Sequence, residues 1–256
     1  MDALLTCLAM AEADEVDTVT AAAMRVAGRD FAEQLDGADE LIRAGGVRSA
    51  KILGRTCIEL VACVRYLAMK NDERVSSAMF LQSFRAAEET CKLYMRAQPP
   101  ERAQPLTMLI KDLRKARIND EYSRQAKLEA SRELDRLESG EPWYGIMGGP
   151  KTVAHLLRIV GLPNLYQRYY QPWSAMVHGV YLLPADGIES RQVAVRPLRH
   201  FAPAEYGLAL ALLDAIGTLA MFHLMHYFAP REVGQAVIDE TVELIESLPG
   251  DLLIAL

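Results

Sequence analysis

Residues 47–70 read VRSAKILGRTCIELVACVRYLAMK, and this stretch decides the fold class. Its apolar residues recur at helical spacing over most of its circumference, as in a helix that lies in a core. Gly45 and Gly46 precede it as a helix stop signal. Asn71 and Asp72 follow it as a break and as the N-cap of a new helix. The stretch therefore predicts one long and largely buried helix.

Helical patterning continues on both sides of this stretch, and only one segment alternates like a strand. That alternation predicts one short β excursion near residues 190–197. Pro172 falls inside a helical pattern and should kink or divide the helix. We therefore expect an all-α protein, a single elaborated helical bundle formed by residues 1–256 as one domain. The other predicted helices cover residues 16–44, 73–97, 106–138, 150–161, 164–183, 204–228 and 230–248.

One predicted helix differs from the others because it is densely charged. Residues 101–141 hold nine basic and nine acidic side chains, with pairs at i,i+3 and i,i+4 spacing. We expect residues 103–139 to form a charged helix that lies on the surface or projects from it. Its 106–138 stretch is then a candidate contact for a protein partner. The core should come instead from the helices over 47–70, 73–97, 164–183 and 204–228.

Length, composition and cysteine usage exclude several classes of protein. A chain of 256 residues that is 51% hydrophobic can bury a core and is not disordered as a whole. The net charge of −6 argues against a general binder of polyanions, but not against a local basic pocket. The four cysteines form no Cys-x-x-Cys pair, so we expect reduced thiols in a cytoplasmic protein and no zinc ribbon. No basic region precedes the first apolar residues, so no signal peptide is expected.

The most apolar segment, residues 204–228, is interpreted as a core helix and not as a membrane span. Its longest run without Asp, Glu, Lys or Arg covers residues 215–230, which is shorter than the roughly 20 apolar residues that a span needs. His223 and His226 lie one turn apart in it, but the repeated Glu-x-x-His pairs of a helical metal site are missing. The sequence therefore predicts no membrane contact, no metal and no cofactor.

Polar side chains within the apolar helices are the candidates for a functional site. Arg55 and Glu59 are four residues apart in the 47–70 helix, and either charge is costly to bury alone. Tyr170, Ser174 and His178 recur every four residues in the 164–183 helix and so share one face. We expect the two helices to face each other, which gathers these side chains into one polar cluster. Such a cluster offers a general base and a guanidinium that can hold an anion, or it fixes the helix register as a satisfied hydrogen-bond network.

Two short motifs resemble a bacterial all-helical family of unknown function. Arg55 and Glu59 fit its Arg-x-x-x-Glu helix, and residues 170–179 fit its Tyr-x-x-x-Ser-x-x-x-His-Gly signature. That family is similar in style to HEPN domains (higher eukaryotes and prokaryotes nucleotide-binding). Many HEPN domains are dimeric helical ribonucleases that use an Arg and a His of one helix without metal. This chain has no arginine one to two turns before His178, so Arg55 would supply the positive charge from another helix.

The resemblance implies a cytoplasmic, homodimeric, HEPN-like protein of a bacterial defence or stress system, of the toxin–antitoxin or anti-phage type. It would bind RNA or a nucleotide and, in the enzymatic version, cleave it as a metal-independent ribonuclease. His178 would be the base, Arg55 would bind the anion and Glu59 would orient its partner. Ser174 and Tyr170 would hydrogen-bond the ligand. The alternative is a non-enzymatic helical interaction module whose polar cluster is structural, and the sequence leaves both functions open.

Overall fold

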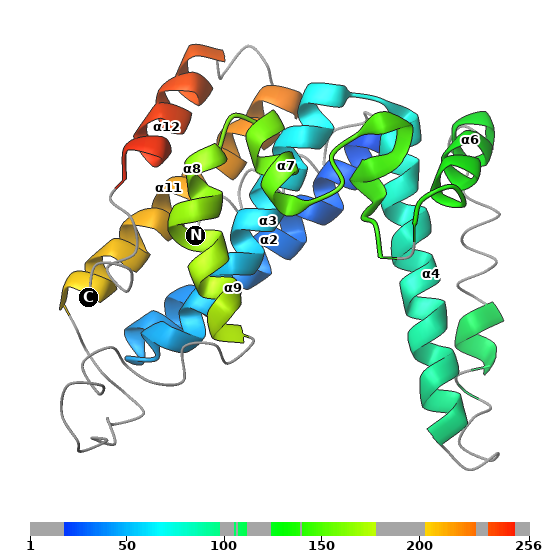
Figure 1. Cartoon of the computed structure of the whole chain (residues 1–256), viewed down its shortest axis with the longest axis horizontal. Helices are drawn as coiled ribbons and strands as arrows, with labels where there is room; N and C mark the ends of the chain where they lie inside the picture. The colour runs from blue at the N-terminus through cyan, green and yellow to red at the C-terminus, as the bar shows by residue number, and fades with distance from the viewer. Residues whose placement is uncertain are drawn as a thin grey trace. The chain divides into compact units, whose positions relative to one another are not determined.

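The structure is a computed structural model that describes residues 18–97, 105, 107–111, 124–138, 140–177, 203–228 and 235–248. Its elements are α-helices, one 3₁₀-helix and one π-helix, and no strand occurs within these residues (Figure 1). The all-α prediction is therefore confirmed. The β excursion predicted near residues 190–197 lies outside the described residues.

The helix bounds agree closely with the sequence pattern for the long helices. The predicted 47–70 and 73–97 helices are observed over those residues, whereas the predicted 164–183 helix is divided, as expected from Pro172. The elements are α2 (Val19–Arg43), α3 (Val47–Lys70), α4 (Glu73–Ala97), α6 (Arg124–Leu134), η1 (Trp143–Gly148, 3₁₀), α7 (Val153–Ile159), α8 (Pro163–Leu165), η2 (Tyr166–Tyr170, π), α9 (Gln171–Val177), α11 (Pro203–Phe228) and α12 (Gln235–Ser247).

Local backbone chemistry explains where α2 ends and where α4 begins. Gly45 adopts a left-handed conformation with φ of 81°. The N–H groups of Gly45 and Gly46 then bond the carbonyls of Ile42 and Leu41, at 2.9 and 2.7 Å, which is a Schellman motif. At the other end of α3, Asp72 Oδ1 accepts the backbone N–H of the second residue of α4 at 2.8 Å, which is an N-cap. Both predicted helix boundaries are confirmed.

The chain divides into two compact units. Among the described residues, unit 1 contains residues 24–69 and all those from Val153 onward, and unit 2 contains residues 18–23 and 70–152. The first turn of α2 therefore belongs to unit 2 and the rest of α2 to unit 1. The sequence interpretation of residues 1–256 as one domain stays a prediction.

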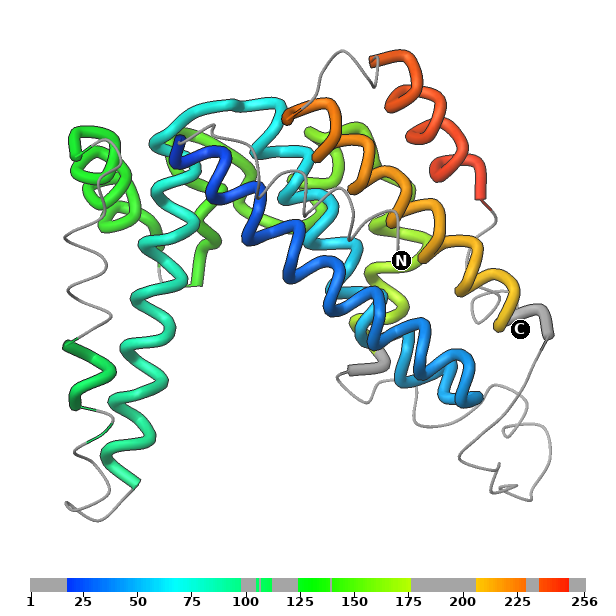
Figure 2. Tube along the Cα trace, turned by 180° about the vertical axis from the view of Figure 1, so that it is seen from behind, coloured from blue at the N-terminus to red at the C-terminus, as the bar shows by residue number. Residues whose placement is uncertain are grey.

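Unit 1 is built around α2, α3 and α11, which run alongside one another (Figure 2). α2 and α11 are antiparallel, because Arg25 lies over the ring of Phe228, 5.3 Å from its centroid, while Leu35 packs against Gly217. A Cβ at Gly217 would lie only 3.0 Å from the Leu35 side chain, so the absence of a side chain permits this close approach.

The core of unit 1 includes one helix that the sequence pattern did not place there. Phe31 of α2 is fully buried, and so is Ala38, seven residues later on the same face of the helix. Alanines such as Ala38 contribute little to a hydrophobic pattern, and α2 was therefore not among the predicted core helices. The same alanines let the helix approach its neighbours closely. The largest fully buried side chains of unit 1 are Met24, Phe31, Ile42, Ile58, Tyr66, Leu67, Leu156, Leu157, Leu162, Tyr169 and Trp173.

Unit 2 pairs α4 with α6, and both helices also contact η1. α4 and α6 lie side by side in both views (Figures 1 and 2). α6 buries Ala126, Ala130 and Leu134, which are four residues apart and share one face. The residue that follows α6, Asp135, accepts a hydrogen bond from Arg85 of α4 at 2.8 Å. Within the charged 103–139 segment, α6 is thus an amphipathic helix, and the projection of the segment from the surface stays a prediction.

α11 is the one described helix that is long and apolar enough to cross a membrane by length and composition. Its Tyr206–Phe228 segment has a mean hydropathy of 1.8, and 56% of its most apolar window is buried inside the protein. Length and composition alone do not distinguish a membrane span from the central helix of a soluble bundle.

Candidate functional site

Three residues of the predicted polar cluster meet in unit 1, where α3 faces the π-helix η2. Arg55 and Glu59 lie one turn apart on α3, and both are directed at Tyr170, the last residue of η2. Arg55 Nη2 donates to the Tyr170 hydroxyl at 2.8 Å, and that hydroxyl donates to Glu59 Oε2 at 3.2 Å. The expectation that these two helices face each other is confirmed. Arg55 and Glu59 are connected through the phenol and not by a direct ion pair.

The guanidinium of Arg55 also makes a cation–π contact with the same tyrosine. Its carbon Cζ lies 4.8 Å from the centre of the Tyr170 ring. Its Nε is buried and has no hydrogen-bond partner within the described part of the chain. Arg55 thus keeps a buried, unused donor beside an aromatic ring, which is the chemistry of a site for an anion.

Burial and charge together keep the Tyr170 hydroxyl protonated. The pKa of Tyr170 is raised to about 12, first by burial and then by the negative charge of Glu59, while Arg55 acts in the opposite direction. The hydroxyl therefore remains a donor to Glu59 at neutral pH. It also remains able to accept from Arg55 at the same time.

Pro172 explains the π-helix that carries Tyr170. Proline has no N–H and its ring clashes with the carbonyl four residues earlier, so it disrupts an α-helix. Here the turn before Pro172 widens, and the N–H of Gln171 bonds the carbonyl of Tyr166, five residues earlier. The rings of Tyr166 and Tyr170 stack with centroids 5.6 Å apart. The predicted disturbance at Pro172 is therefore a π turn followed by α9.

Gly54 brings α3 close to α9 beside the cluster. A Cβ at Gly54 would lie 2.4 Å from the Trp173 ring, which no real structure tolerates without movement. Trp173 is 1% exposed and meets the ring of Tyr169 edge-on at 5.7 Å. The residue before Arg55 therefore sets the separation between the two helices. The sequence analysis did not identify Gly54, although a glycine inside a helix is a signal for close packing.

Of the remaining two predicted site residues, the structure describes Ser174 but not His178. Ser174 lies on α9, one turn after Tyr170, and is half-buried. Its hydroxyl makes no hydrogen bond to any other residue that the structure describes. His178 lies outside the described residues, so its proximity to Arg55 and Glu59 stays a prediction.

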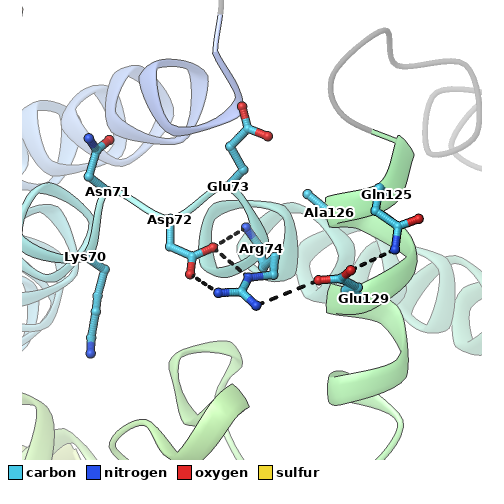
Figure 3. Close-up of a pocket in the computed structure, with 8 residues that line it drawn as sticks. All are labelled: Lys70, Asn71, Asp72, Glu73, Arg74, Gln125, Ala126 and Glu129. Carbon is cyan, nitrogen blue, oxygen red and sulfur yellow. Dashed lines mark hydrogen bonds and ion pairs between the residues drawn. The ribbon is translucent and has the colours of Figure 1, made fainter.

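An open depression in unit 2 is separate from this cluster. It has a volume of about 470 Å³ and lies at the N-terminus of α4 (Figure 3). Its polar groups already bond one another: Arg74 bonds both oxygens of Asp72, at 3.1 and 2.7 Å, and lies 3.8 Å from Glu129. None of the predicted site residues lines it. The free N–H groups of the helix terminus are also partly used by the Asp72 cap.

A second polar pair in unit 1 was not predicted. Arg65 of α3 lies 2.9 Å from the imidazole of His223 in α11. His223 was interpreted as a core or rim residue, and it is 5% exposed. Within the described residues, no group of three or more His, Cys, Asp and Glu side chains could hold a metal ion. Each residue is a polar side chain within an apolar predicted helix, but nothing in the sequence linked Arg65 to His223, 158 positions away.

Comparison with known proteins identifies one similarity. The model of a family of unknown function (DUF5677) matches residues 30–183. This range contains Arg55, Glu59, Tyr170 and Ser174, and it also contains His178. No curated protein and no solved structure shows a significant match to the chain.

Proposed function

Because the chain belongs to the family of unknown function DUF5677, whose matched region contains the whole Arg55–Tyr170–Glu59 cluster, we propose that this cluster is its functional site. The ligand that we propose is RNA or a nucleotide. In this proposal the protein is a HEPN-like, cytoplasmic, homodimeric component of a bacterial defence or stress system.

One observation supports an anionic ligand most directly. Arg55 has a buried Nε without a partner among the described residues, and its guanidinium lies over the ring of Tyr170. A buried donor that no protein group satisfies costs about 1–3 kcal/mol, and a ligand oxygen can recover that cost. A phosphate oxygen suits a guanidinium, and a base can stack near the paired rings of Tyr166 and Tyr170.

The proposed roles follow from this chemistry. Arg55 binds a phosphate, and Glu59 holds Arg55 in place through the Tyr170 hydroxyl. Ser174, one turn further along, supplies a hydroxyl without a partner in the described residues. In the enzymatic version His178 takes the proton from a ribose 2′-hydroxyl, and this oxygen attacks the adjacent phosphate, which Arg55 stabilises. The bond from phosphorus to the 5′-oxygen of the next nucleotide breaks, and that oxygen takes the proton back from His178, which leaves a 2′,3′-cyclic phosphate and a 5′-hydroxyl.

The non-enzymatic alternative has one observation in its favour. Tyr170 donates to Glu59 and accepts from Arg55, so its hydroxyl, Arg55 Nη2 and Glu59 Oε2 are already satisfied within the protein. A satisfied network of this kind fixes the position of η2 against α3 without any ligand. The protein would then act by docking a partner on another surface.

The test uses the full-length protein with a fluorescent single-stranded RNA and with a labelled nucleotide. We expect Arg55→Gln to weaken binding by about tenfold or more, because a charge-assisted contact is lost. Arg43→Gln is the matched control: it also removes one positive charge, from an exposed residue of α2 that pairs with Asp39. His178→Ala should retain binding and the melting temperature but lose RNA cleavage in the presence of EDTA.

Two results would overturn the proposal. RNA and nucleotide affinities that are equal in the wild type and in Arg55→Gln, with both proteins folded, would exclude the ligand site. Undetectable cleavage by the wild type, or cleavage that His178→Ala retains, would exclude the enzymatic version. If Arg55→Gln does not fold, that result supports the structural alternative. The binding assay then uses Arg55→Lys, which keeps the charge.

A further inference from the structure

Arg65 lies in unit 1, ten residues beyond Arg55 on α3, in surroundings of its own. Its Nη1 lies 2.9 Å from Nε2 of His223 on α11. Burial lowers the pKa of His223 to about 3, and the positive charge of Arg65 contributes to this shift, as does His226. The imidazole is therefore neutral at physiological pH, and its Nε2 accepts the hydrogen bond from Arg65. The pair as a whole carries one positive charge.

No carboxylate of the described residues forms an ion pair with Arg65. Asp239 of α12 acts on it only as a more distant charge, and burial lowers the pKa of the guanidinium in spite of it. A buried or half-buried guanidinium is normally matched by a carboxylate at close range. Here its hydrogen-bond partner is a neutral imidazole. The positive charge of Arg65 is therefore not neutralised locally.

The other edge of the guanidinium is unused. Its Nε is buried and has no hydrogen-bond partner within the part of the chain that the structure describes. Its Nη2 likewise bonds no described residue, and it lies 3.7 Å from the position that a Cβ of Gly161 would occupy. Nη2 is therefore a charged donor whose hydrogens no described residue uses, and a guanidinium N–H of this kind binds the oxygens of phosphates and carboxylates.

Gly161 lies beside the Nη2 end of the guanidinium. It is exposed and is the left-handed residue, with φ of 77°, of a Schellman motif that ends α7. The N–H of Leu162 bonds the carbonyl of Leu157 at 2.7 Å, and that of Gly161 bonds the carbonyl of Arg158 at 3.2 Å. Only Arg65 would lie within 4 Å of a Cβ at Gly161, so any side chain there would cover the guanidinium.

We propose that the guanidinium of Arg65, whose Nη2 lies beside the exposed Gly161 and whose Nη1 is held by His223, is a binding site for an oxyanion. The ligand group is a phosphate or a carboxylate, whose oxygens accept from a guanidinium N–H. His223 is a positioning residue: its neutral Nε2 occupies Nη1 and so directs the opposite edge toward the Gly161 turn. The proposal does not rest on the function proposed for Arg55.

The test measures the melting temperature of the full-length protein as sodium phosphate or sodium acetate replaces sodium chloride at constant ionic strength and pH. We expect phosphate, acetate or both to raise the melting temperature of the wild type with a saturating dependence on concentration. Arg65→Gln should weaken the apparent affinity by about tenfold or more. Gly161→Asp should abolish the response, because its carboxylate then occupies the edge of Arg65 from within the chain.

Gly148→Asp is the matched control for the glycine substitution. Gly148 is also exposed and left-handed, with φ of 74°, and no atom lies within 4 Å of its missing Cβ. Gly148→Asp introduces the same charge and the same backbone strain in unit 2. It should keep the wild-type rise in melting temperature with phosphate or acetate. We also expect Gly161→Asp to melt at a higher temperature than Gly148→Asp, because only the former gains an ion pair.

Three outcomes would overturn the proposal. The wild type could respond no more to phosphate and acetate than to chloride. Gly161→Asp could retain the full response while folded. Gly161→Asp and Gly148→Asp could lose it equally, which would indicate a general effect of negative charge. If Arg65→Gln does not fold, the two glycine variants still decide, since both leave Arg65 in place.

Discussion

At the scale of single residues, the Tyr170 hydroxyl connects two charges that have no direct contact. Replacing Tyr170 by Phe leaves Arg55 Nη2 and Glu59 Oε2 without this partner while the ring contact is kept. We expect the free energy of unfolding to fall by about 1–3 kcal/mol, measured by urea denaturation. Tyr166→Phe is the control, because the Tyr166 ring stacks on Tyr170 but its hydroxyl bonds no described residue. Equal losses in both variants would contradict a specific role for the Tyr170 hydroxyl.

The same residue predicts a dependence on alkaline pH. The pKa of Tyr170 in the folded protein, about 12, is above its ordinary value of 10.0, so the folded state holds this proton more tightly than the unfolded state. Its contribution to stability is therefore complete below pH 10 and is lost as the pH rises toward 12. The stability of the wild type should converge on that of Tyr170→Phe over this interval. A constant difference between them from pH 8 to 12 would show that Tyr170 ionises normally.

Residue patterns in the sequence identified part of the site and missed the rest for physical reasons. The i,i+4 spacing placed Arg55 and Glu59 on one face of a helix, and their charge in an apolar segment required a partner. The identity of that partner depended on the packing of α3 against η2, more than a hundred positions away. Tyr170 was therefore predicted as a ligand contact, although its hydroxyl is used within the protein.

At the scale of the elements, the close approach of α3 and α9 depends on Gly54. A Cβ at this position would enter the Trp173 ring, which is buried and surrounded by other side chains. We expect Gly54→Ala to destabilise the protein by about 1–3 kcal/mol in spite of the higher helix propensity of alanine. Gly207→Ala in α11 is the matched control, since nothing lies within 4 Å of its missing Cβ. That variant should gain up to about 1 kcal/mol. A neutral Gly54→Ala would disprove the tight contact.

The start of α4 gives a second prediction at this scale. Asp72 caps α4, and its hydrogen bond with Arg74 lowers the pKa of its carboxyl group below the ordinary value of 3.8. Asp72→Ala should cost about 0.5–2 kcal/mol at pH 7. Asp72→Asn should cost less, because it keeps the cap and loses only the charge. Since the folded pKa is lowered, the charge contribution is present above pH 4 and fades as the pH falls further. A gap between wild type and Asp72→Asn that persists undiminished at pH 2 would contradict this.

Elements with local signals were predictable, and elements shaped by distant contacts were not. Glycines at 45 and 46 and the Asp72 cap act within a few residues, so the bounds of α3 and α4 follow from the sequence alone. Pro172 predicted a disturbance, but its form, a π turn in which the N–H of Gln171 bonds the carbonyl of Tyr166, had no signal of its own in the sequence. The burial of α2 was missed because its small residues matter only through close packing of helices.

At the scale of the whole molecule, the two compact units each bury their own apolar side chains, and buried cysteines report on both. Cys57 and Cys63 lie on α3 in unit 1, and Cys91 lies on α4 in unit 2. Burial raises the pKa of Cys57 to about 12 and also raises that of Cys63, so neither thiol should react in the folded protein. Pulsed thiol labelling across a urea gradient therefore follows the unfolding of each unit separately. The labelled cysteines are identified by mass spectrometry, in a protein in which Cys7 is replaced by serine.

We expect two unfolding midpoints, because separate cores form separate cooperative units. Gly54→Ala should shift the labelling midpoint of Cys57 and Cys63 to lower urea concentration and leave that of Cys91 in place. Asp72→Ala, at the start of α4, should do the reverse, since it weakens unit 2. If all three thiols become reactive at one urea concentration in the wild type and in both variants, the chain unfolds as the single domain that its sequence pattern predicts, and the two units have no energetic independence.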